Sequence, residues 1–226
     1  MRIKVSIIFV ALVTYWGYWL VQLNHKNTQS VAYNERGNIL SELRRYDEAI
    51  ENYRQAILIK VNYADAYNNL ANAQRQKGQL EESVANYKEA IRFNNEHADA
   101  YSNLGIVLSE QGKFEEAVEQ FRKALDLNHN LFQVHDRIAT LLSQQGNIAG
   151  AIFHYQQAIT LYPAFAKAHN NLGSTLAGQG KFKEAIEYFE KAINIDPNYV
   201  DARNNLELAR SLAEIKVDTE TRQEIR

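Results

Sequence analysis

The amino-acid sequence predicts an all-α solenoid of helical hairpins preceded by one transmembrane helix. Residues 30–199 divide into blocks that align at a spacing of 34 residues without an insertion. Each block carries two apolar stripes with helical periodicity, and a short turn separates them. Residues 5–23 contain no charged side chain. Only two prolines and ten glycines occur in 226 residues, which also favours helix over sheet.

The N-terminal segment has the length of a membrane span. Residues 5–23 read VSIIFVALVTYWGYWLVQL, and at about 1.5 Å per residue they give roughly 28 Å of helix, close to the ~30 Å hydrocarbon core of a bilayer. Its second half contains Tyr15, Trp16, Tyr18 and Trp19, and such rings prefer the boundary between hydrocarbon and water. We therefore expect a signal anchor in contact with membrane lipid, followed by a polar linker at 24–29.

Two other interpretations of this segment remain. A cleaved signal peptide requires a shorter apolar core and small residues before the cut, whereas only Gly17 is small near the end. A buried core helix would show a polar face, which the run lacks. If the segment is an anchor, Arg2 and Lys4 before it outweigh Lys26 after it, so residues 1–4 are expected in the cytoplasm. The repeat domain is then expected on the far side, periplasmic or lumenal.

One block shows how each repeat folds. Tyr101, Leu104, Gly105 and Leu108 form one apolar helical stripe, and a second stripe begins at Phe114. Gly112 between them is suited to the left-handed conformation that ends a helix. Each block is therefore a helix, a tight turn and an antiparallel helix, and stacked blocks bury the apolar faces of their neighbours. The predicted repeats are 30–63, 64–97, 98–131, 132–165 and 166–199.

Three positions depart from the pattern. The first block has Arg36 where its siblings have leucine or isoleucine, and Arg44 where they have glycine. Gly150 lies inside the second helix of the fourth block, at a cost of about 1 kcal/mol relative to alanine. Because of Arg36 and Arg44, the first helix of the first block is expected to pack less well than its siblings. Because of Gly150, the fourth block is expected to unfold locally most easily.

The repeats resemble the tetratricopeptide repeat family. The resemblance rests on the period, the openings YNNLA, YSNLG and HNNLG, the QGKF turns, and the second helices EEAVEQF and KEAIEYF. It covers residues 30 to about 216 and implies a right-handed superhelix whose first helices line a concave groove. Residues 200–216 resemble the capping helix of such a stack, and 217–226 read as a polar tail that frays.

The resemblance also implies which side chains line the groove. In this family they occupy the second, fifth, sixth and ninth positions of each first helix, and most are asparagines here. A carboxamide has two donors and an acceptor, so a row of them can pair with the backbone of an extended peptide. The alternative is that these asparagines serve packing between helices. The candidate groove residues are Asn34, Asn38, Asn68, Asn69, Asn72, Ser102, Asn103, Arg137, Lys167, Asn170, Asn171, Asn204 and Asn205.

Composition and motifs argue against several other functions. The absence of cysteine removes disulfides, zinc–thiolate sites and thiol catalysis. His135 and His169 take the place of Tyr33, Tyr67 and Tyr101 in earlier blocks, so aromatic packing explains them better than metal binding. No phosphate loop or nucleophile motif occurs. With 25 basic and 27 acidic residues, no nucleic-acid surface is expected. We expect no catalysis, cofactor or small-molecule substrate.

The sequence therefore predicts a membrane-anchored interaction scaffold or assembly factor that binds extended protein segments in its groove. Three alternatives stay open. The protein could be a holdase chaperone or translocon accessory, an assembly factor for a photosystem or for a pilus or envelope complex, or the regulatory subunit of a separate enzyme.

Overall fold

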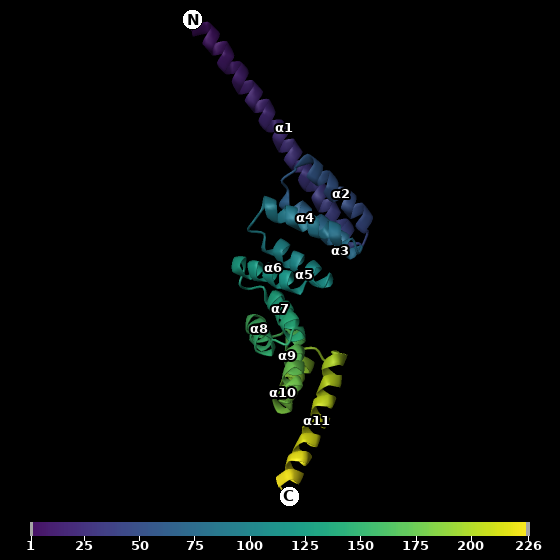
Figure 1. The fold of residues 1–226 in the computed structure, drawn as a ribbon. Coiled ribbons are helices and arrows are strands. Elements are labelled where there is room, and N and C mark those ends of the chain that lie inside the picture. The colour runs from purple at the N-terminus through teal and green to yellow at the C-terminus, as the bar shows by residue number, and fades with distance from the viewer. Residues whose placement is uncertain (1, 225–226) are drawn as a thin grey trace. The chain divides into compact units, whose positions relative to one another are not determined.

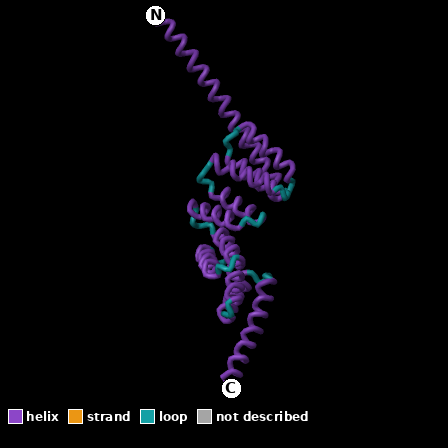
Figure 2. Tube along the Cα trace, viewed as in Figure 1, coloured by secondary structure: helices purple, strands orange, loops and turns teal. Residues whose placement is uncertain are grey.

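The computed structural model describes the backbone of residues 2–224 and the side chains of Trp16 and residues 21–216. Within these residues the chain forms eleven α-helices and no strand (Figures 1 and 2), which confirms the all-α prediction. The helices are α1 (Arg2–Glu42), α2 (Tyr46–Ile59), α3 (Ala64–Gln76), α4 (Leu80–Phe93), α5 (Ala98–Glu110), α6 (Phe114–Leu127), α7 (Phe132–Gln144), α8 (Ile148–Leu161), α9 (Ala166–Gly178), α10 (Phe182–Ile195) and α11 (Val200–Glu224). They belong to two compact units, Met1–Gln120 and Phe121–Arg226.

In the first unit the helices pack as successive hairpins. The C-terminal part of α1 pairs with α2, and α3 pairs with α4. The second helix of each hairpin also contacts the first helix of the next, and α1, α3 and α5 contact one another in sequence. Tyr53 and Tyr87 are the largest fully buried side chains of this core, surrounded by alanines that let the helix axes approach closely.

The second unit repeats this arrangement. The pairs are α7 with α8 and α9 with α10, while α7, α9 and α11 contact one another in sequence. Helix α11 packs on α10 and continues to Glu224, beyond residue 216, where the capping helix was expected to end. The right-handed superhelix implied by the resemblance concerns all repeats together and stays a prediction.

Each hairpin turn contains one residue with a left-handed backbone. Gly78, Gly112, Gly146 and Gly180 have φ values from 72° to 78°. In the first hairpin Arg44 takes this place with a φ of 58°. In both kinds of turn, the residue after the left-handed one donates its backbone N–H to a carbonyl in the last turn of the helix. Gln79 N donates to Gln74 O at 3.0 Å, and Arg45 N donates to Leu40 O at 2.8 Å. The substitution at Arg44 therefore changes the strain of the turn and not its hydrogen bonds.

Gly150 has a local role in the first turn of α8. Asn147 caps this helix, and its Oδ1 atom accepts a hydrogen bond from the Gly150 N–H at 3.1 Å. A Cβ at position 150 would come within 3.0 Å of this oxygen and of the Leu142 side chain. The glycine therefore makes room for the cap and for Leu142, a reason that the sequence pattern did not show.

The structure corrects the expectation of a membrane segment. Among the residues it describes, no helix is both long enough and apolar enough to cross a bilayer. The prediction of a signal anchor at 5–23, with a cytoplasmic N-terminus, lipid contact and the repeats on the far side, is therefore wrong. The physical reason lies in α1, which does not stop after residue 23 and carries Lys26, Glu35, Arg36 and Glu42 further along. Apart from Trp16 and 21–23, the side chains of that segment lie outside the described residues.

The residues expected as a linker are helical as well. Residues 24–29 lie inside α1, which reaches the first hairpin without a break. Two side chains bond back to the helix here, since Thr28 donates to the Asn24 carbonyl and Ser30 donates to the Asn27 carbonyl. The apolar N-terminal run and the first repeat are thus parts of one helix.

Candidate functional site

Within each unit, most of the asparagines among the candidate groove residues are joined by hydrogen bonds between successive first helices. At the fifth position of the repeat, Asn34, Asn68, Asp136 and Asn170 are buried. At the sixth position, Asn69, Asn103, Asn171 and Asn205 are half-buried. Each of these four donates a hydrogen bond to the fifth-position side chain of the preceding repeat, 35 residues earlier. We call these eight residues the carboxamide ladder.

In the first unit the ladder has two rungs. Asn69 Nδ2 donates to Asn34 Oδ1 at 3.1 Å, and it also lies 3.1 Å from Asn38 Oδ1. Asn103 Nδ2 donates to Asn68 Oδ1 at 3.1 Å. These bonds join α1 to α3 and α3 to α5. A lost rung would leave a buried acceptor without its partner, so the ladder stabilises the stacking of repeats.

In the second unit the ladder contains a carboxylate. Asn171 Nδ2 donates to Asp136 Oδ1 at 3.0 Å, and Lys167 Nζ donates to Asp136 Oδ2 at 2.9 Å. Asp136 is only 2% exposed, so its charge requires these partners. Asn205 Nδ2 donates to Asn170 Oδ1 at 2.9 Å and extends the row onto α11.

The ninth position is tied to the second helix of the same repeat. Tyr53 donates from its hydroxyl to Asn38 Oδ1 at 2.9 Å, and Tyr87 donates to Asn72 Oδ1 at 2.5 Å. Burial raises the pKa of Tyr53 to about 12 and the pKa of Tyr87 further still, so both phenols stay protonated donors. Asn38 and Asn72 are therefore bound from within the repeat.

The remaining candidates lie nearer to solvent. Ser102 is half-buried, whereas Arg137, Lys167 and Asn204 are exposed. Exposed charged residues border the ladder in both units. Glu35, Asp65 and Asp99 do so in the first unit, and Arg137, Lys167 and Asp201 do so in the second. Within each unit the structure thus brings most of the predicted residues together, with the asparagines in contact with one another and the charged side chains accessible.

An apolar cavity lies at the end of the row. It measures about 200 Å³ and has the carboxamide of Asn205 and the hydroxyl of Ser174 at its side. Leu208 and Leu212 from α11 and Phe189 from α10 supply most of its apolar wall. The sequence pattern had assigned Leu208 and Leu212 to the capping helix and not to the groove. Leu208 and Leu212 follow Asn204 by four and eight residues, and this helical spacing would have placed them on the same side as the groove residues.

A histidine pair was also missed. His135 on α7 and His154 on α8 lie with their Nδ1 atoms 2.9 Å apart. Burial lowers the pKa of both imidazoles, that of His154 to about 4. Only one of the two facing nitrogens can carry a proton in this geometry. Within the described residues, no group of three or more histidine and acidic side chains is arranged to hold a metal ion.

Comparisons with protein families match most of the repeat region. The model described as TPR repeat matches residues 37–77, 71–112 and 139–180. The model described as tetratricopeptide repeat matches residues 98–131 and 166–199. A comparison with curated protein sequences gives no match.

Solved structures share the fold at low sequence identity. Pseudomonas aeruginosa pilF superimposes with a TM-score of 0.76 at 20% identity, covering 87% of this chain and 88% of that one. MamA protein gives 0.66 at 21% identity, covering 75% and 92%. YrrB, described as a TPR protein with an unusual peptide-binding site, gives 0.64 at 24% identity, covering 83% and 95%.

Proposed function

The chain belongs to the tetratricopeptide repeat family, and we propose that it is a protein-interaction scaffold that binds an extended segment of a partner protein along its first helices. The observation that carries this proposal is the carboxamide ladder with its accessible edge. The sixth-position asparagines are half-buried, so each is held in place by its rung while part of the side chain faces solvent.

The ladder suits backbone recognition. Asn103 and Asn171 each use one N–H for the rung, and a carboxamide has two. The second N–H can pair with the peptide groups of a ligand, and so can the carbonyl, although in Asn171 it already accepts a bond of 3.5 Å from Asn170 Nδ2 and uses its second lone pair. An orientation fixed in advance lowers the entropy lost on binding. The YrrB structure supports this proposal, since its description names a peptide-binding site on the same fold.

The cavity at the end of the row supplies a pocket for one apolar side chain. Leu208 is exposed and Leu212 partly so, and a ligand side chain inserted between them and Phe189 would remove apolar surface from water. Asn205 lies at the same place and can hold the backbone of the inserted residue. We propose that the ligand segment carries a hydrophobic residue that occupies this pocket.

The test begins with peptides selected from a random display library on the full chain. Their affinities are then measured by fluorescence anisotropy for variants that leave the ladder intact: L208E in the cavity and D99K beside the row. We expect each to weaken binding by about tenfold or more, equal to 1.4 kcal/mol. The matched control is E81K, which changes an exposed charge on a second helix. Selected peptides that respond only to E81K would refute the proposal.

Backbone recognition favours a second candidate function, the holdase type of chaperone. Carboxamides that pair with peptide groups do not read side chains, so one chain could hold many unrelated segments. The selected peptides separate the two candidates. A shared sequence motif indicates one partner, whereas unrelated sequences with a single apolar residue in common indicate a holdase.

A further inference from the structure

The first repeat exposes two side chains of its first helix, at the third and tenth positions, that are buried in every later repeat. At the tenth position of the first helix, Ile39 is 59% exposed, whereas its counterparts are 8% exposed or less: Ala73, Val107, Leu141, Thr175 and Ala209. At the third position Ala32 is exposed, whereas its counterparts are at most 2% exposed: Ala66, Ala100, Val134, Ala168 and Ala202. Ala32, Arg36, Ile39 and Leu43 follow one side of α1, and we call them the first-repeat face.

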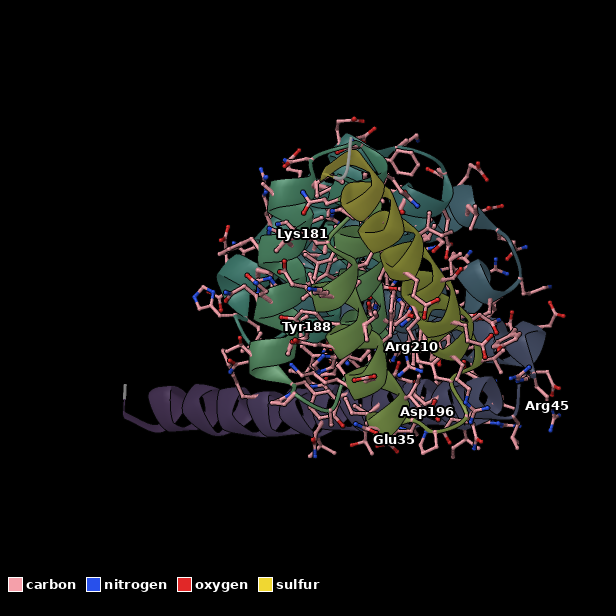
Figure 3. The ribbon with its side chains drawn as sticks, turned by 90° about the horizontal axis from the view of Figure 1, so that it is seen from below. Glu35, Arg45, Lys181, Tyr188, Asp196 and Arg210 are labelled. Atoms are coloured by element: carbon pink, nitrogen blue, oxygen red, sulfur yellow. The ribbon has the colours of Figure 1, made fainter. Side chains whose placement is uncertain are left out.

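The later repeats show what this face accommodates. In them it packs against the second helix of the preceding hairpin, as α3 does on α2 and α9 does on α8. Among residues 2–224 no hairpin lies ahead of α1, and Ala32 and Ile39 are exposed. The C-terminal end differs, because Arg203, Glu207 and Arg210 are exposed on the side of α11 where a second helix would pack. Figure 3 labels Arg210, which pairs with Glu190 of α10 at 2.8 Å. Where a neighbouring hairpin would pack, the described residues are therefore apolar at the N-terminal end, at Ile39, and charged at the C-terminal end.

The charges beside Ile39 indicate which occupant fits. Arg36 replaces the leucine or isoleucine of the other repeats, and Glu42 lies as far after Ile39 as Arg36 lies before it. Both are exposed. If two copies of α1 pack antiparallel with a twofold axis at Ile39, each Arg36 lies opposite Glu42 of the other copy. A twofold interface repeats every contact, so this pair forms twice around a centre of isoleucine and leucine.

The carboxylate of Glu48 on α2 is already paired within the chain. Arg45 holds it through two hydrogen bonds of 2.6 Å. Those bonds are the main reason that the pKa of Glu48 is lowered, and Arg36 adds only a minor contribution. Arg36 can therefore turn to a second carboxylate.

We propose that the chain forms a twofold dimer through the first-repeat face, with α1 antiparallel to α1 of the second copy and Arg36 paired with its Glu42. The apolar part of this interface, Ala32 and Ile39, lies on a side of α1 other than the one that carries Asn34 and Asn38, whereas Glu42 follows Asn38 by one turn. The interface itself includes neither Asn34 nor Asn38.

The absence of cysteine makes a direct test possible. Helices in contact have axes about 8–10 Å apart, which brings facing Cα atoms within disulfide range. The I39C variant of the full chain should form a disulfide-linked dimer under mild oxidation. The matched control is L208C, because Leu208 is equally exposed, at 59%. Equal rates of crosslinking in the two variants would overturn the proposal.

A charge exchange tests the pairing. In sedimentation equilibrium of the full chain, R36E and E42R should each raise the dimer Kd by about tenfold or more, since each puts like charges opposite one another. The double variant R36E/E42R should return the Kd to within about threefold of the unsubstituted chain. A native chain that stays monomeric, or a double variant as weak as the single ones, would rule the interface out. Peptide affinity in the selected-peptide assay should stay unchanged throughout.

Discussion

Asn171 donates a hydrogen bond from Nδ2 to Oδ1 of Asp136 at 3.0 Å, across the boundary between two successive repeats. The bond gives the asparagine an orientation and gives a buried carboxylate one of its two partners. The bond joins the repeats, and in the proposed function the same side chains also form the edge of the binding surface. Substitutions in the row therefore change folding before they report on binding.

Replacing Asn171 by alanine is expected to lower the free energy of unfolding by about 1–3 kcal/mol, because it leaves a buried carboxylate with Lys167 as its remaining donor. Urea denaturation followed by circular dichroism measures the change. N204A serves as the control, since Asn204 is exposed and belongs to no rung; its effect should stay within about 0.5 kcal/mol. Equal effects of the two substitutions would contradict a structural role of the ladder.

The Tyr87–Asn72 bond predicts a coupled pair. Y87F removes the hydroxyl that donates to Asn72 Oδ1 and should destabilise the chain by about 1 kcal/mol. In the double variant Y87F/N72A the acceptor is gone as well, so the total loss should be smaller than the sum of the two single losses. A double-mutant cycle by urea denaturation measures the coupling. Strict additivity would show that the hydrogen bond contributes nothing, and Y162F, at a largely exposed tyrosine, provides the baseline.

Arg44 predicts a stabilising substitution. The residue has a left-handed backbone, which costs an L-residue with a side chain roughly 1–2 kcal/mol and costs glycine little. R44G should therefore raise the free energy of unfolding by about 1 kcal/mol and the Tm by several degrees. The reverse change, G78A, should lower both by a similar amount, because nothing but the backbone conformation opposes a Cβ there. Calorimetry of the two variants checks the opposite signs.

The His135–His154 pair predicts a loss of stability in mild acid. The pKa of His154 falls from 6.5 to about 4 on folding, so the unfolded chain binds the proton more readily. This contribution to stability is complete above pH 6.5 and declines as the pH falls from 6.5 towards 4. At pH 5 the loss should be about 1–2 kcal/mol. Urea denaturation at pH 7.5 and pH 5 measures it, and H154N should show a smaller difference between the two pH values. An unchanged difference would assign the acid sensitivity to other groups.

The sequence predicted the repeats well because period, glycine turns and apolar stripes are all local signals. Gly78 and Gly112 could be placed in left-handed turns from their spacing alone. The packing role of the asparagines was one of two interpretations at that stage. It could be decided only in three dimensions, because Asn103 and its acceptor Asn68 lie 35 residues apart.

Two predictions failed or fell short for different physical reasons. The membrane anchor was predicted from the hydropathy of residues 5–23 alone. In the structure this run belongs to a longer helix, which continues through a polar stretch into the first hairpin. The histidines were judged by their spacing along single helices. His135 and His154 face each other across a hairpin, on two different helices, and spacing within one helix cannot show that contact.

The carboxamide ladder has a consequence for how such an array can change its length. The repeats 64–97 and 166–199 each supply an acceptor at the fifth position, Asn68 or Asn170, and a donor at the sixth, Asn69 or Asn171. A duplication of either 34-residue segment therefore brings one complete donor–acceptor pair with it, and its excision removes one donor and one acceptor together. An insertion of any other size would shift the two positions out of alignment. Growth by whole modules is therefore built into the side chains that join them, independently of what the surface binds.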